Sequence, residues 1–165
     1  MHIKRIVWGS ACAAALLVVV SGGVPALAQV NVAPAARRDI ADEERNRAFV
    51  INLYDLVFNK HDLKAAEDMI SEGYIQHNPH FPTSRAAFLE ILAKRFKQNP
   101  ESHARIVRSV ADGDLVWLHV HSVAGPQDRG RAIVNIFRVA GGKIVEHWDV
   151  VQPVPATSEN DNTMF

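Results

Sequence analysis

The chain of 165 residues has a single cysteine, no cluster of basic residues and no long uninterrupted apolar run. Because the cysteine, Cys12, lies close to the N-terminus, the rest of the chain can form no disulfide, and a domain there must be held by its hydrophobic core. The 18 Lys and Arg residues balance 18 Asp and Glu residues. Nucleic acids are bound through a basic surface, so this composition argues against a nucleic-acid partner.

The most apolar stretch falls short of a membrane span. It runs from Ile6 to Val20 and is interrupted by Gly9 and Ser10, whereas a transmembrane helix needs about 20 apolar residues. The basic pair Lys4–Arg5 precedes it, and a small-x-small ending, Ala26-Leu27-Ala28, follows it. These are the three parts of a secretory signal, which we favour over an uncleaved membrane anchor.

We therefore expect residues 1–28 to be a cleaved signal peptide, which makes the protein periplasmic or secreted, with no membrane association after cleavage. The mature chain of 137 residues then starts at Gln29 and carries 16 basic and 18 acidic residues. Its length suits one domain with one core. Residues 29–38 show no periodicity and are expected to be a flexible leader, so the domain itself should span residues 39–165.

The first half of this domain has helical periodicity. Asp39 or Asp42 can cap a first helix, which ends at Asn59. A second, shorter helix is expected from Leu63 to Ile70, and residues 74–79 are expected to form an irregular turn. A third helix starts near Ser84 and stops before Pro100. The apolar positions of the first helix recur at helical spacing and are Phe49, Val50, Leu53, Leu56 and Val57.

After Pro100 the apolar residues alternate, which is typical of strands. Four strands are predicted, separated by Asp112-Gly113, a polar loop and Gly141-Gly142, and they cover residues 104–110, 115–123, 132–139 and 143–151. Three helices followed by consecutive antiparallel strands indicate an α+β fold, with the helices packed against a strongly curved antiparallel sheet.

The last hairpin determines which side chains share a face. With a three-residue loop, Val139 faces Lys143, so Asn135 lies opposite His147. Alternation then gathers five residues on one face, whereas a two-residue loop would shift the register by one and swap the faces. The five residues are Asn135, Phe137, His147, Asp149 and Val151.

His119 and His121 share one strand face with Trp117. If this is the pocket face, they could join His147 and Asp149 in proton transfer, because histidine titrates near neutral pH. A structural role, bonded to backbone or to Asn135, is the alternative. A zinc or copper site formed with His147 or His77 is a further alternative. It is the weaker one, because two histidines separated by one residue are common by chance.

Several segments together resemble a known family. They are Ile136-Phe137-Arg138, Glu146-His147-Trp148-Asp149, residues 74–79 and the closing residues 162–165. Over about residues 42–165 the chain is similar to the SnoaL-like branch of the nuclear transport factor 2-like superfamily. The resemblance implies a cone-shaped domain with a pocket between sheet and helices. It also implies frequent dimerisation through the outer sheet face, where Trp148 and Val150 would need cover.

The resemblance aligns pocket residues of relatives with Asn135, His147 and Val151. Relatives commonly carry aspartate where this chain has Asn135, which can donate a hydrogen bond but cannot take a proton. The expected catalytic residues are Asp149, His147, His119 and His121. The expected substrate-binding residues are Asn135, Phe137, His77, Val151 and Tyr74, with His77 at the pocket mouth.

Two functions remain open from the sequence. The first is a cofactor-free and metal-free cyclase or isomerase that removes a proton α to a carbonyl group, as polyketide cyclases of the family do. The second is a non-catalytic exported module that binds a small lipophilic ligand. The asparagine at position 135 favours the second, and the retained Glu-His-Trp-Asp segment favours the first. In both cases the partner is a small molecule, and a homodimer is expected.

Overall fold

The computed structural model describes residues 38–165. The expected signal peptide, and the leader up to residue 37, lie outside the described residues. Within residues 38–165 no helix combines the length and the apolarity that a membrane crossing requires. The elements are α1 (Ile40–Phe58), α2 (Leu63–Glu67), β1 (Ile70–Gln76), α3 (Arg85–Gln98), β2 (His103–Asp112), β3 (Leu115–Val123), β4 (Arg131–Ala140) and β5 (Lys143–Pro153).

Each helix starts at a polar cap. The carboxylate of Asp39 accepts hydrogen bonds from the backbone N–H groups of Ala41 and Asp42, so Asp39 is the cap of α1. Ser84 caps α3 in the same way, as its hydroxyl accepts from the N–H of Ala87. The short α2 begins at the cap Asp62 and ends before Ile70, because the chain there enters a strand.

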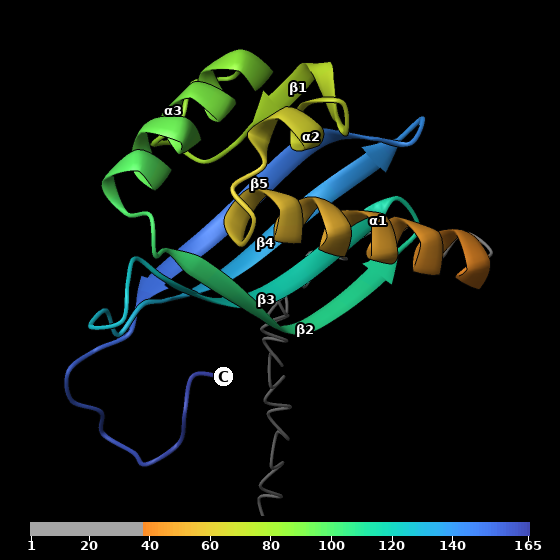
Figure 1. Cartoon of the computed structure of the whole chain (residues 1–165). Coiled ribbons are helices and arrows are strands. Elements are labelled where there is room, and N and C mark those ends of the chain that lie inside the picture. Colours follow the sequence, from red (N-terminus) through yellow and green to blue (C-terminus); the bar gives the residue numbers. More distant parts are fainter. Residues whose placement is uncertain (1–37) are drawn as a thin grey trace, which may run out of the picture. The chain divides into compact units, whose positions relative to one another are not determined.

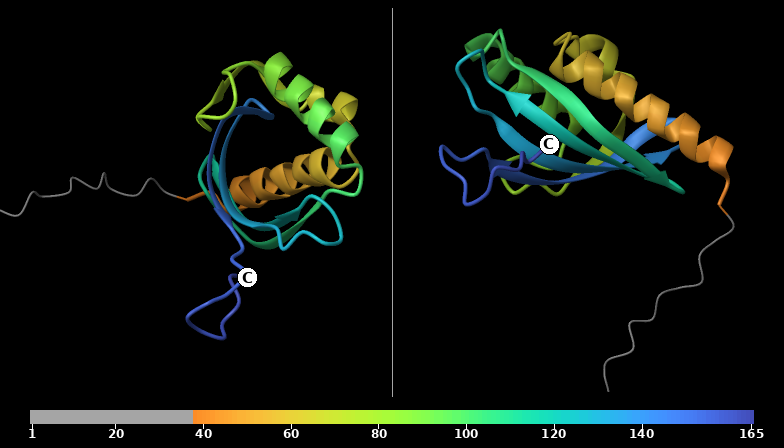
Figure 2. Two further views of the ribbon diagram at one scale, coloured as in Figure 1. Left: turned by 90° about the vertical axis from the view of Figure 1, so that its left-hand side faces the viewer. Right: turned by 90° about the horizontal axis from the view of Figure 1, so that it is seen from below.

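The five strands form one sheet in the order β1-β5-β4-β3-β2. The sheet curves around α1 and α3, which lie on its concave side (Figures 1 and 2). The α+β fold with helices against a strongly curved sheet is therefore confirmed. Inward-facing residues of β3 and β5 meet α1 in the core, where the most deeply buried side chains are Ile70, Leu118, Ile144, Val50, Val116 and Val120.

Strand β1 is the element that sequence reasoning missed. Residues 70–76 pair in parallel with β5, so the sheet is mixed, and the expected helix to Ile70 and irregular turn from Tyr74 were wrong. The strand is at the sheet edge, and its partner lies about 70 residues away in sequence. Its inward positions Tyr74 and Gln76 include a polar residue, which hides the alternation that marks a half-buried strand.

In the β4–β5 hairpin the residue pairings differ from those predicted, but the residues expected to share one face do share it. A two-residue loop joins Ala140 to Lys143, and a bulge at Val145 then adds one residue to β5. As a result Asn135 lies opposite Asp149, and Phe137 lies opposite His147. The shorter loop alone would have swapped the faces. The bulge reverses that swap, so these four side chains share the concave face.

Candidate functional site

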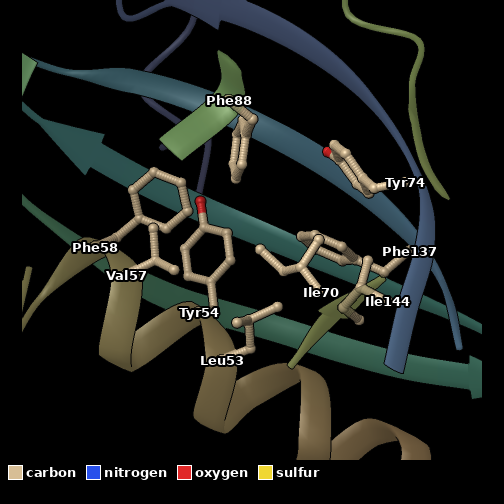
Figure 3. A pocket seen from close by; sticks show the side chains of 9 residues that line it. All are labelled: Leu53, Tyr54, Val57, Phe58, Ile70, Tyr74, Phe88, Phe137 and Ile144. Carbon is tan, nitrogen blue, oxygen red and sulfur yellow. The ribbon is translucent and has the colours of Figure 1, made fainter. Parts of the chain in front are cut away.

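A small, mainly apolar cavity lies between α1, β1, α3 and the concave face of the sheet (Figure 3). Its volume of about 20 Å³ has room for about one water molecule. Two of the residues expected from the sequence, Tyr74 and Phe137, belong to its wall. The full lining is Leu53, Tyr54, Val57, Phe58, Ile70, Tyr74, Phe88, Phe137 and Ile144.

The polar groups of this wall are two tyrosine hydroxyls. Those of Tyr54 and Tyr74 both point toward the Phe88 side of the cavity (Figure 3). Burial raises the pKa of both phenols, and the charge of Asp149 raises them further. At neutral pH both hydroxyls therefore keep their protons and can act as hydrogen-bond donors.

Behind the cavity wall lies a chain of buried polar groups centred on His147. Its Nδ1 lies 2.9 Å from Oε1 of Gln76, and its Nε2 lies 3.1 Å from Oδ1 of Asn135. The Gln76 amide donates to the Tyr74 hydroxyl at 2.7 Å, and the Asn135 side chain reaches the Tyr54 hydroxyl at 3.5 Å. The chain thus connects the two cavity hydroxyls through His147.

Burial fixes the protonation state of this imidazole. It lowers the pKa of His147 to about 3, with a smaller contribution from His77, so the ring is neutral and carries one N–H. Oε1 of Gln76 already accepts the backbone N–H of Asn78 at 3.0 Å, so Gln76 presents an oxygen and Nδ1 of His147 carries the proton.

Nε2 of His147 is then an acceptor, which determines how Asn135 is oriented. A half-turn of the Asn135 carboxamide, which exchanges two atoms of nearly equal size, brings its N–H₂ to Nε2. Its oxygen then accepts from the Tyr54 hydroxyl. With this orientation each hydrogen-bond donor of the network faces an acceptor.

Asp149 lies across the hairpin from Asn135 and is half-buried. Both of its carboxylate oxygens accept from the side-chain amide of Asn78, at 2.7 and 2.8 Å. Neither Asp149 nor His147 contributes to the wall of the small cavity. The negative charge of Asp149 nevertheless contributes to the raised pKa of both cavity tyrosines.

His119 and His121 lie on the convex face, so the expectation that they line the pocket was wrong. The inward residues of β3 are Val116, Leu118 and Val120, and the histidines alternate with them. His119 accepts from Arg108 at 3.0 Å, and His121 lies 2.9 Å from the carbonyl oxygen of Arg129. Both rings stack on Phe165 of the C-terminal segment.

His77 and Val151 also depart from their expected places. His77 alternates outward from Gln76, stacks on Trp148 at 4.6 Å and lies 2.8 Å from Glu146. Val151 is on the concave side by alternation but is 42 % exposed, beyond the buried part of the sheet. Beside them, Arg138 of β4 donates to Glu146 of β5 at 2.8 Å.

These placements separate the residues that a metal site would have needed. His119 and His121 face away from His147, with the sheet between them. Over residues 38–165 no three His, Cys, Asp or Glu side chains gather in a metal-binding arrangement.

Sequence reasoning missed three residues of the polar network: Tyr54, Gln76 and Asn78. Tyr74, Gln76 and Asn78 alternate as buried residues with the exposed Ile75 and His77, but two of the three are polar, so the sequence gives no apolar alternation that would mark them. Tyr54 follows Leu53 on the buried side of α1. A tyrosine at such a position usually has a hydrogen-bond partner for its hydroxyl, which indicates a polar residue across the core.

Comparisons with known proteins agree with this architecture. Residues 50–147 match the SnoaL-like domain family. A proposed ketosteroid isomerase from Kribbella flavida is 19% identical, with a TM-score of 0.59 over 72% of this chain and 86% of its own. A proposed polyketide cyclase from Bacillus cereus is 17% identical, with a TM-score of 0.58 over 72% and 85%.

A third solved structure, an NTF2-like protein of unknown function from Mesorhizobium loti, is 21% identical, with a TM-score of 0.56 over 71% of this chain and 97% of its own. No curated protein matches the chain. Identities of this size show the fold alone, whereas the family match covers more than half of the chain. The chain therefore belongs to the SnoaL-like family, and it shares the fold of NTF2-like proteins.

Proposed function

We propose that the protein is a cofactor-free isomerase or cyclase that removes a proton from the carbon α to a carbonyl group. The observation that supports this most is the position of the Asp149 carboxylate, held by Asn78 and close enough for its charge to act on two protonated tyrosine hydroxyls. A base beside fixed hydrogen-bond donors is what enolisation requires.

Asp149 is the base in this proposal, because His147 is unsuited to the role. An imidazole with a pKa of about 3 is a weak proton acceptor at neutral pH. Asp149 takes the α-proton, and the electron pair of the C–H bond forms the enolate. The enolate oxygen accepts from the hydroxyl of Tyr74, which accepts from Gln76 and keeps its own proton free to donate. The proton then returns at a different carbon in an isomerisation, or the enolate carbon attacks a second carbonyl of the same molecule in a cyclisation.

His147, Gln76 and Asn135 act in this proposal as positioning residues. Their hydrogen bonds hold the two hydroxyls, 2.7 Å from Gln76 and 3.5 Å from Asn135, in fixed directions. Fixed donors are worth about 3–4 kcal/mol each at a developing oxyanion. A substrate larger than water needs more room than the cavity offers, so Phe58 or Phe88 on its wall must move when it enters.

The test is hydrogen–deuterium exchange at the α-carbon of a panel of ketones and 1,3-dicarbonyl compounds in D₂O, followed by NMR. Asp149→Asn should slow exchange by about 100-fold or more, because the general base is lost. The matched control is Asp161→Asn, the same chemical change on the exposed C-terminal segment, which should leave the rate unchanged. Circular dichroism of both variants checks that the fold is intact.

The alternative is a non-catalytic module that binds a lipophilic molecule, and it also has support. The cavity wall is apolar apart from two hydroxyls, and position 135 is an amide that cannot exchange protons with His147. If wild-type protein exchanges no member of the panel faster than buffer alone, the catalytic proposal is contradicted. Binding of an apolar ligand would then be the remaining function.

We further propose that the protein is exported and dimeric. The N-terminal sequence supports export. The convex face supports a dimer, because its exposed apolar residues include Val110, Val134 and Val150. One periplasmic preparation from a Gram-negative host tests both. Its intact mass should correspond to a chain beginning at Gln29, and light scattering should give twice that mass. A membrane-bound full-length chain contradicts export, and a monomer mass at micromolar concentration contradicts the dimer.

A further inference from the structure

Helix α3 closes one side of the cavity but is less deeply buried than α1. Of its 14 residues only Leu92 is fully buried, and only Phe88 contributes to the cavity wall. Helix α1 buries a stripe that includes Leu53 and Tyr54, and it faces Phe88 across the cavity (Figure 3). Elements with few buried apolar side chains open at a lower free energy than the rest of a fold. Helix α3 is therefore the part of the wall that is easiest to displace.

Polar contacts fix the N-terminal end of α3. Ser84 caps the helix, and the guanidinium of Arg85 donates to the carbonyl oxygen of Ile70 at 3.1 Å. The same guanidinium lies 3.8 Å from the carboxylate of Glu67 on α2 and 3.6 Å from that of Glu72 on β1. The beginning of α3 is thus joined to two other elements through one side chain.

The C-terminal end of α3 is held by contacts between rings. Phe96 stacks on His61 with 4.0 Å between the centroids, and it meets the ring of Phe58 on the cavity wall edge-on at 6.2 Å. One residue earlier, the guanidinium of Arg95 lies over the ring of Phe81 at 4.4 Å. Such contacts break without leaving a buried hydrogen-bonding group unpaired. The C-terminal end is therefore the one that can separate from the fold.

His61, on which Phe96 stacks, has an unusual backbone conformation. Its φ is +53°, in the left-handed region that a side chain such as histidine adopts only at a cost in free energy. Its Nε2 donates to the carbonyl oxygen of Ser102, 3.0 Å away, in the segment that follows α3. Residues in such conformations persist because their surroundings hold them, and they occur often at moving elements. His61 thus links the loop between α1 and α2 to the end of α3.

We propose that α3 is a lid that opens at its C-terminal end, where Phe96 leaves His61 and Phe58, and that this opening admits ligands to the cavity. The closed cavity of about 20 Å³ has room for about one water molecule, so an organic ligand requires a movement of its wall. Phe88 moves with the helix and enlarges the space. The inference rests on this cavity as the ligand site but not on the proposed chemistry, so it holds if the protein only binds its ligand.

The variant His61→Asn tests the lid. Asparagine tolerates the left-handed backbone and keeps a donor for Ser102, but it offers no ring to Phe96. Neither His61 nor Phe96 lines the cavity, so the substitution adds no room to it. A ligand that binds only the open state gains affinity in proportion to the open fraction. N-phenyl-1-naphthylamine, a neutral dye that fluoresces in apolar surroundings, should therefore bind about tenfold more tightly to His61→Asn than to the wild type.

Hydrogen–deuterium exchange followed by NMR measures the opening without a ligand. Amides in the C-terminal half of α3 should exchange about tenfold faster in His61→Asn, while those of α1 keep their wild-type rates, because the opening is local. Phe96→Leu also removes the stacked ring and should have the same two effects. His103→Asn, the same change at an exposed histidine, is the matched control and should alter neither exchange nor dye binding.

Unchanged or weaker dye binding in both variants would overturn the proposal, because a lid that opens more often must bind its ligand more tightly. Unchanged exchange in α3, or equal acceleration in α1, would also overturn it, since the second result shows a general loss of stability. A dye that binds neither wild type nor variants would overturn the role of the opening in ligand entry. None of these readouts involves α-proton exchange, so failure of that separate test leaves the lid standing, and the converse also holds.

Discussion

Lowering the pH from 7 to 4 should destabilise the wild-type protein by about 3 kcal/mol more than a variant that lacks the His147 imidazole. The pKa of this imidazole is about 3 in the folded protein, against about 6.5 for an ordinary histidine. Between these values the unfolded chain binds a proton that the folded chain excludes. Stability therefore falls as the pH falls, by about 1.4 kcal/mol per unit below pH 6.5.

Carboxylates elsewhere also titrate in this range, so the comparison needs a matched variant. His147→Gln keeps one donor and one acceptor for Gln76 and Asn135 but has no titrating group. Urea unfolding of both proteins at several pH values should show the difference in their unfolding free energies changing with pH. His103→Gln, a change at an exposed histidine, should follow the wild type. Parallel curves for wild type and His147→Gln would show that the folded protein takes up the proton as readily as the unfolded chain.

Asn135→Asp should raise the pKa of His147 from about 3 to above 6.5, which is a change of about 5 kcal/mol in the relative free energies of its two protonation states. The Asn135 side chain lies 3.1 Å from Nε2, so the substitution puts a carboxylate beside the ring. An adjacent negative charge stabilises the imidazolium, and Nε2 changes from acceptor to donor. The acid destabilisation described above should then disappear.

The pKa can be measured by following the ring signals of His147 by NMR from pH 3 to 9. The new pair titrates jointly, so the apparent values belong to both groups. Asn160→Asp, an addition of the same charge on the exposed C-terminal segment, serves as the control and should leave the His147 value unchanged. A pKa that stays near 3 in Asn135→Asp would contradict the contact between the two side chains. If the protein is an enzyme, the added acid should also accelerate α-proton exchange.

The sequence by itself determined the fold class and the main elements. These follow from local signals, namely the caps at Asp39 and Ser84, the change of apolar period after Pro100, and the alternation along residues 131–153. Such signals depend on neighbouring residues and persist whatever packs against them. The similarity of the segment around His147 to a known family was also a property of the sequence, and the match over residues 50–147 confirmed it.

The tertiary structure decided which face of β3 is buried, and therefore placed His119 and His121 outside the pocket. Alternation shows that two residues share a face, but packing of α1 on the sheet determines which face becomes the interior. The pairing of β1 with β5, across some 70 residues, brought Gln76 and Asn78 to His147 and Asp149. No local pattern contains that contact, because it exists only when both segments meet in the folded sheet.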